Sequence, residues 1–146
     1  MPFYSDTNAM WRRFAPDDAG HPVVKAAMDT ILRQGETLHI SAQNLIEFQS
    51  VATRPIEGNG LGLTSAEANE KAHELEAFFE FLPDTPDIYL QWRSLVEKYD
   101  VRGKQVHDAR LVAVMLSYGL TDLLTLNPSD FRRFTEINVV EPKDVQ

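Results

Sequence analysis

Short runs of apolar residues alternate along the chain with longer segments in which apolar positions recur every three or four residues. The short runs predict β-strands, and the longer segments predict amphipathic helices. Helices between short strands indicate parallel pairing through right-handed crossovers, and hence an α/β fold, a three-layer α/β/α sandwich with a short central parallel sheet. The predicted strands cover residues 3–4, 38–41, 123–126 and 138–140, and the predicted helices cover residues 21–34, 43–53, 65–82, 85–99 and 107–118, with a helical turn at 128–134.

Capping and turn residues set the ends of several predicted elements. Gly35 is placed to end the first long helix, because glycine adopts the left-handed conformation that closes helices. Thr64 and Glu67 form a capping box at the start of a later helix. The segment 55–63 contains three Gly and an Asn and is therefore predicted to be a loop. Since no repeat, low-complexity tract or flexible linker interrupts this order, we expect a single domain over residues 1–146.

The composition narrows the chemistry that the chain can perform. With 43% hydrophobic residues, including 8 Phe and 2 Trp, the chain can bury a core, which argues against global disorder. The absence of cysteine excludes disulfides, zinc–thiolate sites and thiol nucleophiles. No apolar run reaches the roughly 20 residues of a membrane helix. No signal-peptide core is present either, so we expect a cytoplasmic protein without a membrane partner.

The chain is acidic, with 22 Asp and Glu residues against 14 Lys and Arg and a formal net charge of -8. A protein that binds nucleic acid is more simply expected to be basic. Net charge does not report where the charges lie, however, and short basic clusters occur at residues 12–13, 54, 102–104 and 132–133. Such clusters are usually solvated surface, so charge alone assigns no partner.

Three acidic residues occupy positions that differ from the usual exposed helix faces. Asp6 follows the first predicted strand, Glu47 lies in an otherwise uncharged helix, and Asp108 lies at the start of the helix 107–118. Each has an ordinary structural explanation, as a turn residue, a solvent-facing residue or a helix N-terminal acid. Ligand sites in α/β folds gather at the strand ends, however, and three carboxylates meeting there would repel one another. A hard divalent cation such as Mg²⁺ or Mn²⁺ would relieve that repulsion and could activate a water for attack on a phosphate.

Four segments, taken in order, carry a resemblance to a known family. They are Asp6-Thr7-Asn8 and residues 44–48 (NLIEF), 106–111 (VHDARL) and 124–131 (LTLNPSDF). In this order and spacing they resemble the motifs of PIN domains, most closely those of bacterial VapC-type toxin ribonucleases from type II toxin–antitoxin systems. The resemblance runs from residue 3 to about residue 142, and the order of the four segments carries more weight than any one of them.

The resemblance implies a PIN fold and hydrolysis of RNA phosphodiester bonds that depends on Mg²⁺ or Mn²⁺. It maps the three catalytic, metal-binding acids of the family onto Asp6, Glu47 and Asp108. It also implies a homodimer and a cognate antitoxin protein that neutralises the enzyme by covering the acidic centre. The loop around residues 58–62 and the helix 65–82 are where we expect substrate selection.

The fourth, more variable acidic position of the family falls on Asn127 in this sequence. Asn127 offers a carbonyl oxygen or a hydrogen bond to a metal-bound water, but it brings no negative charge. Asp130 lies three residues later and could substitute, although the adjacent Phe131 suggests that Asp130 caps a turn. Asn8 and Thr125 map onto polar positions that orient the carboxylates or water.

Three alternatives remain open at this point. A non-catalytic PIN scaffold that binds RNA or a protein partner would explain Asn127 as a sign of a decaying site. A DNA-acting nuclease would use the same carboxylates on another substrate. A phosphotransfer receiver or aspartate phosphatase also uses acids at strand ends, but Asp6-Thr7-Asn8 lacks the paired aspartates of such proteins.

Overall fold

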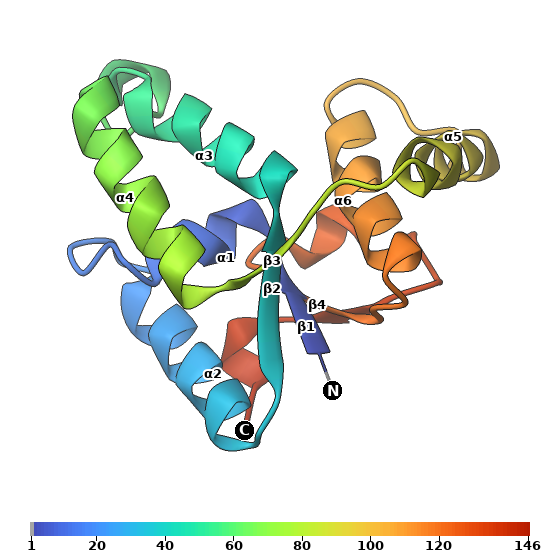
Figure 1. Cartoon of the computed structure of the whole chain (residues 1–146), viewed down its shortest axis with the longest axis horizontal. Coiled ribbons are helices and arrows are strands. Elements are labelled where there is room, and N and C mark those ends of the chain that lie inside the picture. The colour runs from blue at the N-terminus through green and yellow to red at the C-terminus, as the bar shows by residue number, and fades with distance from the viewer. Residues whose placement is uncertain (1) are drawn as a thin grey trace.

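The computed structural model describes residues 2–146, and five parallel strands form its centre (Figure 1). The sheet order is β3-β2-β1-β4-β5, so the first strand of the chain lies in the middle, with Phe3 opposite Leu38 and Tyr4 opposite Leu123. This arrangement confirms the predicted α/β fold. The strands are β1 Pro2–Ser5, β2 Thr37–Ser41, β3 Glu80–Leu82, β4 Asp122–Leu124 and β5 Asn138–Val140.

Helices cover both faces of the sheet, and α5 and α6 lie on the side opposite α1 and α2 (Figure 1). The helices α3 and α4 pack against each other as a pair. The helices are α1 Thr7–Arg12, α2 His21–Arg33, α3 Ala42–Thr53, α4 Ser65–Phe78, α5 Asp87–Tyr99 and α6 Gln105–Ser117, and the 3₁₀ turns are η1 Ile56–Gly58, η2 Pro128–Asp130 and η3 Pro142–Asp144.

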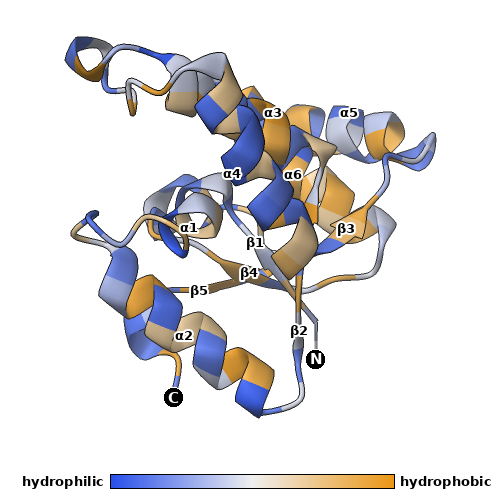
Figure 2. Ribbon diagram, turned by 60° about the vertical axis from the view of Figure 1, so that its left-hand side comes forward, coloured by the Kyte–Doolittle hydropathy of each residue, from blue (hydrophilic) through white to orange (hydrophobic). Residues whose placement is uncertain are grey.

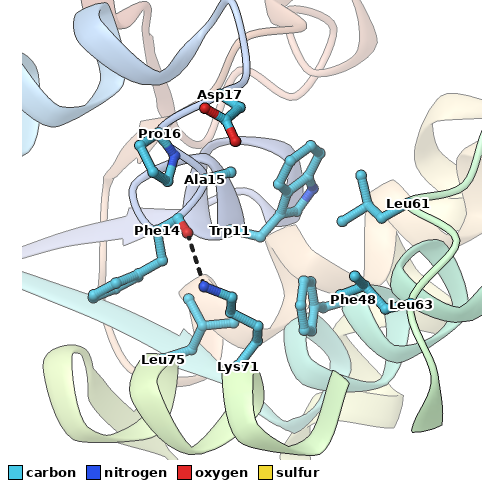
Figure 3. Close-up of a pocket in the computed structure, with 10 residues that line it drawn as sticks. All are labelled: Trp11, Phe14, Ala15, Pro16, Asp17, Phe48, Leu61, Leu63, Lys71 and Leu75. Atoms are coloured by element: carbon cyan, nitrogen blue, oxygen red, sulfur yellow. Dashed lines mark hydrogen bonds between the residues drawn. The ribbon is translucent and has the colours of Figure 1, made fainter. Parts of the chain in front are cut away.

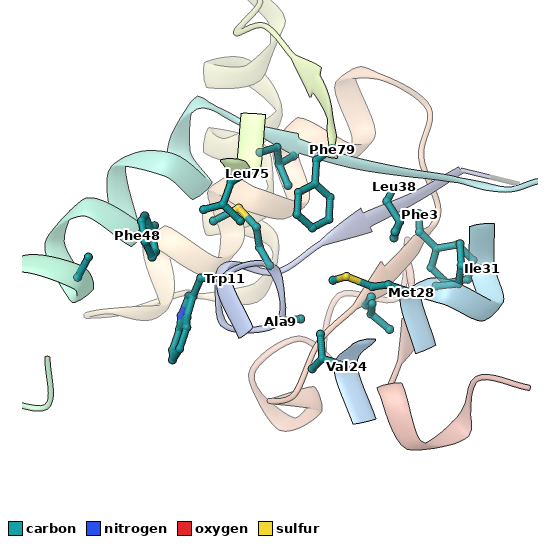
Figure 4. Packing of buried hydrophobic residues seen from close by; sticks show 14 of the residues in the cluster. Phe3, Ala9, Trp11, Val24, Met28, Ile31, Leu38, Phe48, Leu75 and Phe79 are labelled. Atoms are coloured by element: carbon teal, nitrogen blue, oxygen red, sulfur yellow. The ribbon is translucent and has the colours of Figure 1, made fainter. Parts of the chain in front are cut away.

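Alternation along the central strand divides the core into two clusters. Phe3 belongs to one cluster of buried side chains, which also contains Met28 of α2 and Leu75 of α4 (Figure 4). Tyr4 points to the other face and packs with buried side chains of α5 and α6, such as Leu95 and Leu111. Two clusters form because successive side chains of a strand point to opposite faces of the sheet. The banding of α2 in Figure 2 shows the amphipathic pattern that the sequence predicts for it.

Most predicted elements are confirmed within a few residues. Gly35 has a φ of 78° just after α2, as expected of a glycine that ends a helix. Thr64 and Glu67 form the predicted capping box, with reciprocal hydrogen bonds of 3.1 and 2.9 Å. The helix predicted from residue 107 begins slightly earlier, at Gln105. No helix within residues 2–146 combines the length and apolar character that crossing a lipid bilayer requires.

The helix predicted over 65–82 is wrong at its C-terminal end. It stops at Phe78, and Glu80–Leu82 forms the edge strand β3 beside β2. Phe79 is already extended, with φ −89° and ψ 154°, and its ring is buried. The apolar stripe of the helix continues into these aromatic residues, so periodicity alone could not separate the two states. Pairing with β2 satisfies the backbone groups of an aromatic-rich segment that also suits a strand.

Helix α1 was not predicted from the sequence. Its six residues are too few to show a helical period, and helices this short are marginal without tertiary support. Here the support comes from burial, since Ala9, Met10 and Trp11 enter the core and Asp6 caps the helix. Because α1 begins directly after β1, Asp6 and Thr7 lie at the carboxyl end of the central strand.

Candidate active site

Asp6 is fixed at the carboxyl end of the central strand. Its Oδ1 accepts a hydrogen bond from the backbone nitrogen of Thr7 at 2.7 Å, which makes Asp6 the cap of α1. Its Oδ2 accepts a hydrogen bond from Thr125 Oγ1 at 2.8 Å, just after the neighbouring strand β4. The residue is 5% exposed. Two neutral donors therefore hold a buried carboxyl group between two strand ends.

Glu47 is held by hydrogen bonds from two different helices. Thr7 Oγ1 of α1 donates to Glu47 Oε1 at 2.6 Å, and Gln43 Nε2 of α3 donates to Glu47 Oε2 at 3.0 Å. Gln43 also donates to the carbonyl of His107 at 2.7 Å and accepts a hydrogen bond from Arg110 at 2.9 Å. This network links α1, α3 and α6 around the Glu47 carboxylate.

A fully buried amide underlies this network. Asn44 Oδ1 accepts hydrogen bonds from Tyr4 Oη at 2.7 Å and from the backbone nitrogen of Ser41 at 2.8 Å. Asn44 Nδ2 donates to the carbonyl of Ser5 at 3.0 Å and to Thr7 Oγ1 at 3.2 Å. Asn44 thus ties the first turn of α3 to β1, and it positions the hydroxyl that reaches Glu47.

The three acidic residues singled out in the sequence line one cavity of about 370 Å³ together with Asp130. Asp108 reaches it from the first turn of α6, which follows the turn at residues 101–104. The residues therefore come together from distant parts of the chain, as predicted for strand ends and helix starts. The lining residues are Asp6, Thr7, Asn8, Glu47, Ser50, Val51, Arg54, Lys104, Asp108 and Asp130.

The carboxyl groups of this cavity interact electrostatically. Burial, together with the charges of Glu47 and Asp130, raises the pKa of Asp6 to about 6 against the hydrogen bonds from Thr125 and Thr7. Burial, followed by the charges of Asp6, Asp130 and Glu47, raises the pKa of Asp108 to about 7. Both pKa values lie above their unfolded values near 3.8. The two groups therefore favour folding at low pH, and this contribution is lost as the pH rises through about 6 to 7.

These properties fit a hard divalent cation. The donors are carboxylate and hydroxyl oxygens, which Mg²⁺ and Mn²⁺ prefer, and a positive ion would relieve the repulsion that raises the pKa values. Within residues 2–146, no three acidic or histidine side chains already form a close ligand set. Mg²⁺ commonly binds through one or two carboxylates and retains several waters, so a complete protein shell is not required.

The two candidates for a fourth acidic position, Asn127 and Asp130, lie in different places. Asn127 lies beside a neighbouring hollow with Asn8 and Arg12, outside the acidic cavity, and its backbone nitrogen donates to Thr125 Oγ1 at 2.9 Å. Asp130 lines the acidic cavity, and its charge acts on both Asp6 and Asp108. The expectation that Asp130 caps a turn is wrong, because Asn127 occupies the position before η2.

Sequence reasoning missed Thr7, Gln43 and Asn44, which hold the acids in place. A signal for the last two was present in α3, where they lie four and three residues before Glu47. Residues at these separations share a face of a helix. Two buried amides on the same helix face as Glu47 could therefore have been assigned to the hydrogen-bond network around its carboxylate.

A second cavity, of about 250 Å³, is apolar and lies between α1, α3, α4 and the segment 61–63 (Figure 3). Lys71 donates to the carbonyl of Phe14 at 3.4 Å across one side of it. The indole nitrogen of Trp11, another lining residue, is buried and has no hydrogen-bond partner within residues 2–146. A buried donor without an acceptor is costly, and such a group is satisfied when an acceptor binds next to it.

Comparison with solved structures shows the same architecture in bacterial proteins. VapBC2 from Rickettsia felis, bound to a promoter DNA fragment, matches with a TM-score of 0.72 and 15% identity over 97% of this chain and 98% of that chain. A toxin–antitoxin complex from Klebsiella pneumoniae matches with a TM-score of 0.65 and 19% identity over 95% and 96%. VapC20 from Mycobacterium tuberculosis, a toxin that cleaves the sarcin–ricin loop, matches with a TM-score of 0.58 and 19% identity over 83% and 86%.

At these identities the likeness shows a shared fold. No curated protein is significantly similar in sequence. The family model of the PIN domain, however, matches residues 3–137, which include the strand end that carries Asp6, the helix that carries Glu47 and the helix that carries Asp108. This chain therefore belongs to the PIN domain family.

Proposed function

We propose that this protein is an endoribonuclease that depends on a divalent metal and acts as the toxin of a toxin–antitoxin pair. The observation that carries the proposal is the cavity at the sheet edge, where Asp6, Glu47, Asp108 and Asp130 come together in a PIN domain. Carboxylates clustered in this way are suited to a metal-assisted hydrolysis of phosphodiesters, which needs no nucleophilic side chain.

In this proposal Asp6, Glu47 and Asp108 hold Mg²⁺ or Mn²⁺. When bound, the ion would polarise a phosphate oxygen and lower the pKa of a coordinated water. Thr125 and Thr7 keep the carboxylates of Asp6 and Glu47 oriented through the hydrogen bonds described above. Asp130 adds the fourth negative charge that Asn127 does not supply.

RNA is favoured as substrate because one structurally similar protein is a toxin that cleaves the sarcin–ricin loop. A protein partner is favoured because another similar structure is a toxin–antitoxin complex. The apolar cavity beside Trp11 offers a place where an antitoxin segment could insert an apolar side chain and a backbone carbonyl. We further propose that residues 1–146 form a single domain, which acts in the cytoplasm as a homodimer.

The proposal is tested by incubating the purified protein with single-stranded RNA in Mn²⁺ or Mg²⁺, and with DNA of the same sequence. We expect internal cleavage of the RNA that stops in excess EDTA and resumes when Mn²⁺ is restored. Cleavage of the DNA alone would identify a DNA nuclease instead. RNA binding without turnover would identify a non-catalytic scaffold, and cleavage that persists in EDTA would contradict the metal-dependent mechanism.

Asp130 and Asn127 are the two candidates for the fourth acidic position, and changing the charge at each should affect the cleavage rate unequally. Asp130→Asn is expected to lower the cleavage rate by about 10- to 100-fold, because it removes a charge from the acidic cavity. Asn127→Asp is expected to change the rate by less than about threefold, since Asn127 lies beside the neighbouring hollow. Initial rates at saturating Mn²⁺ measure both effects, and a large gain from Asn127→Asp would reverse this assignment.

A further inference from the structure

Two basic side chains differ from all the others in the protein. The chain has 14 Lys and Arg residues, and within residues 2–146 only Arg54 and Lys104 have no hydrogen-bond, ion-pair or aromatic partner for their side chains. Both side chains line the cavity that holds Asp6, Glu47 and Asp108. The two unpaired cations therefore line the same cavity as the clustered carboxylates.

The backbone that carries each cation is well positioned. Arg54 follows α3, the helix of Glu47, and Lys104 precedes α6, the helix of Asp108. The carbonyl of Arg54 accepts a hydrogen bond from the nitrogen of Gly62 at 2.9 Å. At Gly60 an added Cβ would lie 2.1 Å from that same carbonyl oxygen, so the loop packs tightly against Arg54. The backbone of Arg54 is thus restrained while its side chain remains exposed and unpaired.

An RNA strand must overcome repulsion to reach this site, because the protein has a net charge of -8 and four acids line the cavity. Cations at the cavity can supply local attraction. An arginine can bind a phosphate through two parallel hydrogen bonds, and a lysine acts as a compact point charge. An unpaired cation is available for this without first breaking an ion pair.

We propose that Arg54 and Lys104 bind backbone phosphates of the RNA substrate and so position the strand across the acidic cavity. This inference rests on the proposed ribonuclease function. The two side chains act as positioning residues, because the carboxylates remain the groups that take part in hydrolysis. Losing either side chain should weaken substrate binding and reduce the dependence of that binding on salt. The rate of the chemical step should change little.

The test measures KM and kcat for RNA cleavage in Mn²⁺ over a series of salt concentrations. Arg54→Gln and Lys104→Gln are each expected to raise KM by about three- to tenfold and to leave kcat within about twofold. Each should also reduce the slope of log(1/KM) against log[salt] by about 0.7, and the double variant by about 1.4, as expected for lost contacts to single strands. Arg54→Lys and Lys104→Arg should retain the slope.

Arg33→Gln is the matched control, because Arg33 is an exposed cation at the end of α2 whose side chain, among residues 2–146, donates only to Thr30. It should change neither KM nor the salt dependence. If Arg54→Gln and Lys104→Gln also leave both quantities unchanged in an enzyme that cleaves RNA, the inference is overturned and the ribonuclease proposal stands. If the wild-type protein does not cleave RNA at all, the proposed function and this inference are overturned together.

Discussion

Replacing Asp6 by Asn is expected to lower metal-dependent RNA cleavage by about 10³-fold or more while the protein remains folded. The amide keeps the size of the side chain and can still accept a hydrogen bond from the Thr7 nitrogen, but it removes a charge that the ion requires. Because burial already disfavours the ionised form of Asp6, loss of that charge should not destabilise the metal-free protein. Initial cleavage rates and thermal unfolding measure the two effects.

Asp108→Asn should behave in the same way, since Asp108 shares the cavity and its pKa is also raised by burial. Asp87→Asn is the matched control, because Asp87 occupies the first turn of α5 as Asp108 occupies that of α6, but lies outside the acidic cavity. Its cleavage rate should equal that of the wild type. If Asp6→Asn or Asp108→Asn retained full activity, the assignment of that residue as a metal ligand would be contradicted.

Replacing Asn44 by Ala is expected to destabilise the protein by about 3–5 kcal/mol. The change leaves the Ser41 nitrogen and the Ser5 carbonyl without their side-chain partner and frees Thr7 from one of its contacts. Leaving buried polar groups unpaired costs more than losing an exposed hydrogen bond. Urea unfolding monitored by circular dichroism gives the free energy of unfolding directly.

Asn69→Ala provides the comparison, because Asn69 is an exposed asparagine on α4. It should change the free energy of unfolding by less than about 0.5 kcal/mol. Asn44→Ala should also lower the cleavage rate under conditions where the protein is folded, since Thr7 then holds Glu47 less firmly. A destabilisation below about 1 kcal/mol would show that the network contributes little to the fold.

The sequence predicted secondary structure best in segments where a single physical signal determines the element that forms. Short runs of apolar residues predicted β1, β2, β4 and β5, because a strand that packs against a core needs apolar side chains. It failed at β3, where Phe79 and its neighbours suit both a helix face and an edge strand. It failed at α1 as well, because a six-residue helix depends on burial of Trp11 and its neighbours more than on its own pattern.

The acidic residues of the site could be selected from the sequence because Asp6, Glu47 and Asp108 fall at strand and helix positions that meet at one sheet edge. The choice between Asn127 and Asp130 could not be made in this way, since it depends on how the turn η2 directs two side chains only three residues apart. The unpaired state of Arg54 and Lys104 likewise depends on distances to every neighbouring carboxylate, which no local pattern encodes.

The most direct test of the proposed metal site is the anomalous scattering of Mn²⁺ in crystals of the wild-type protein. We predict a single strong peak, or a closely spaced pair, inside the cavity and at coordination distance from carboxylate oxygens of Asp6, Glu47 or Asp108. The same peak should be lost from crystals of Asp6→Asn. Manganese that binds only elsewhere on the surface, at concentrations that support RNA cleavage, would contradict the assignment of these acids as the catalytic centre.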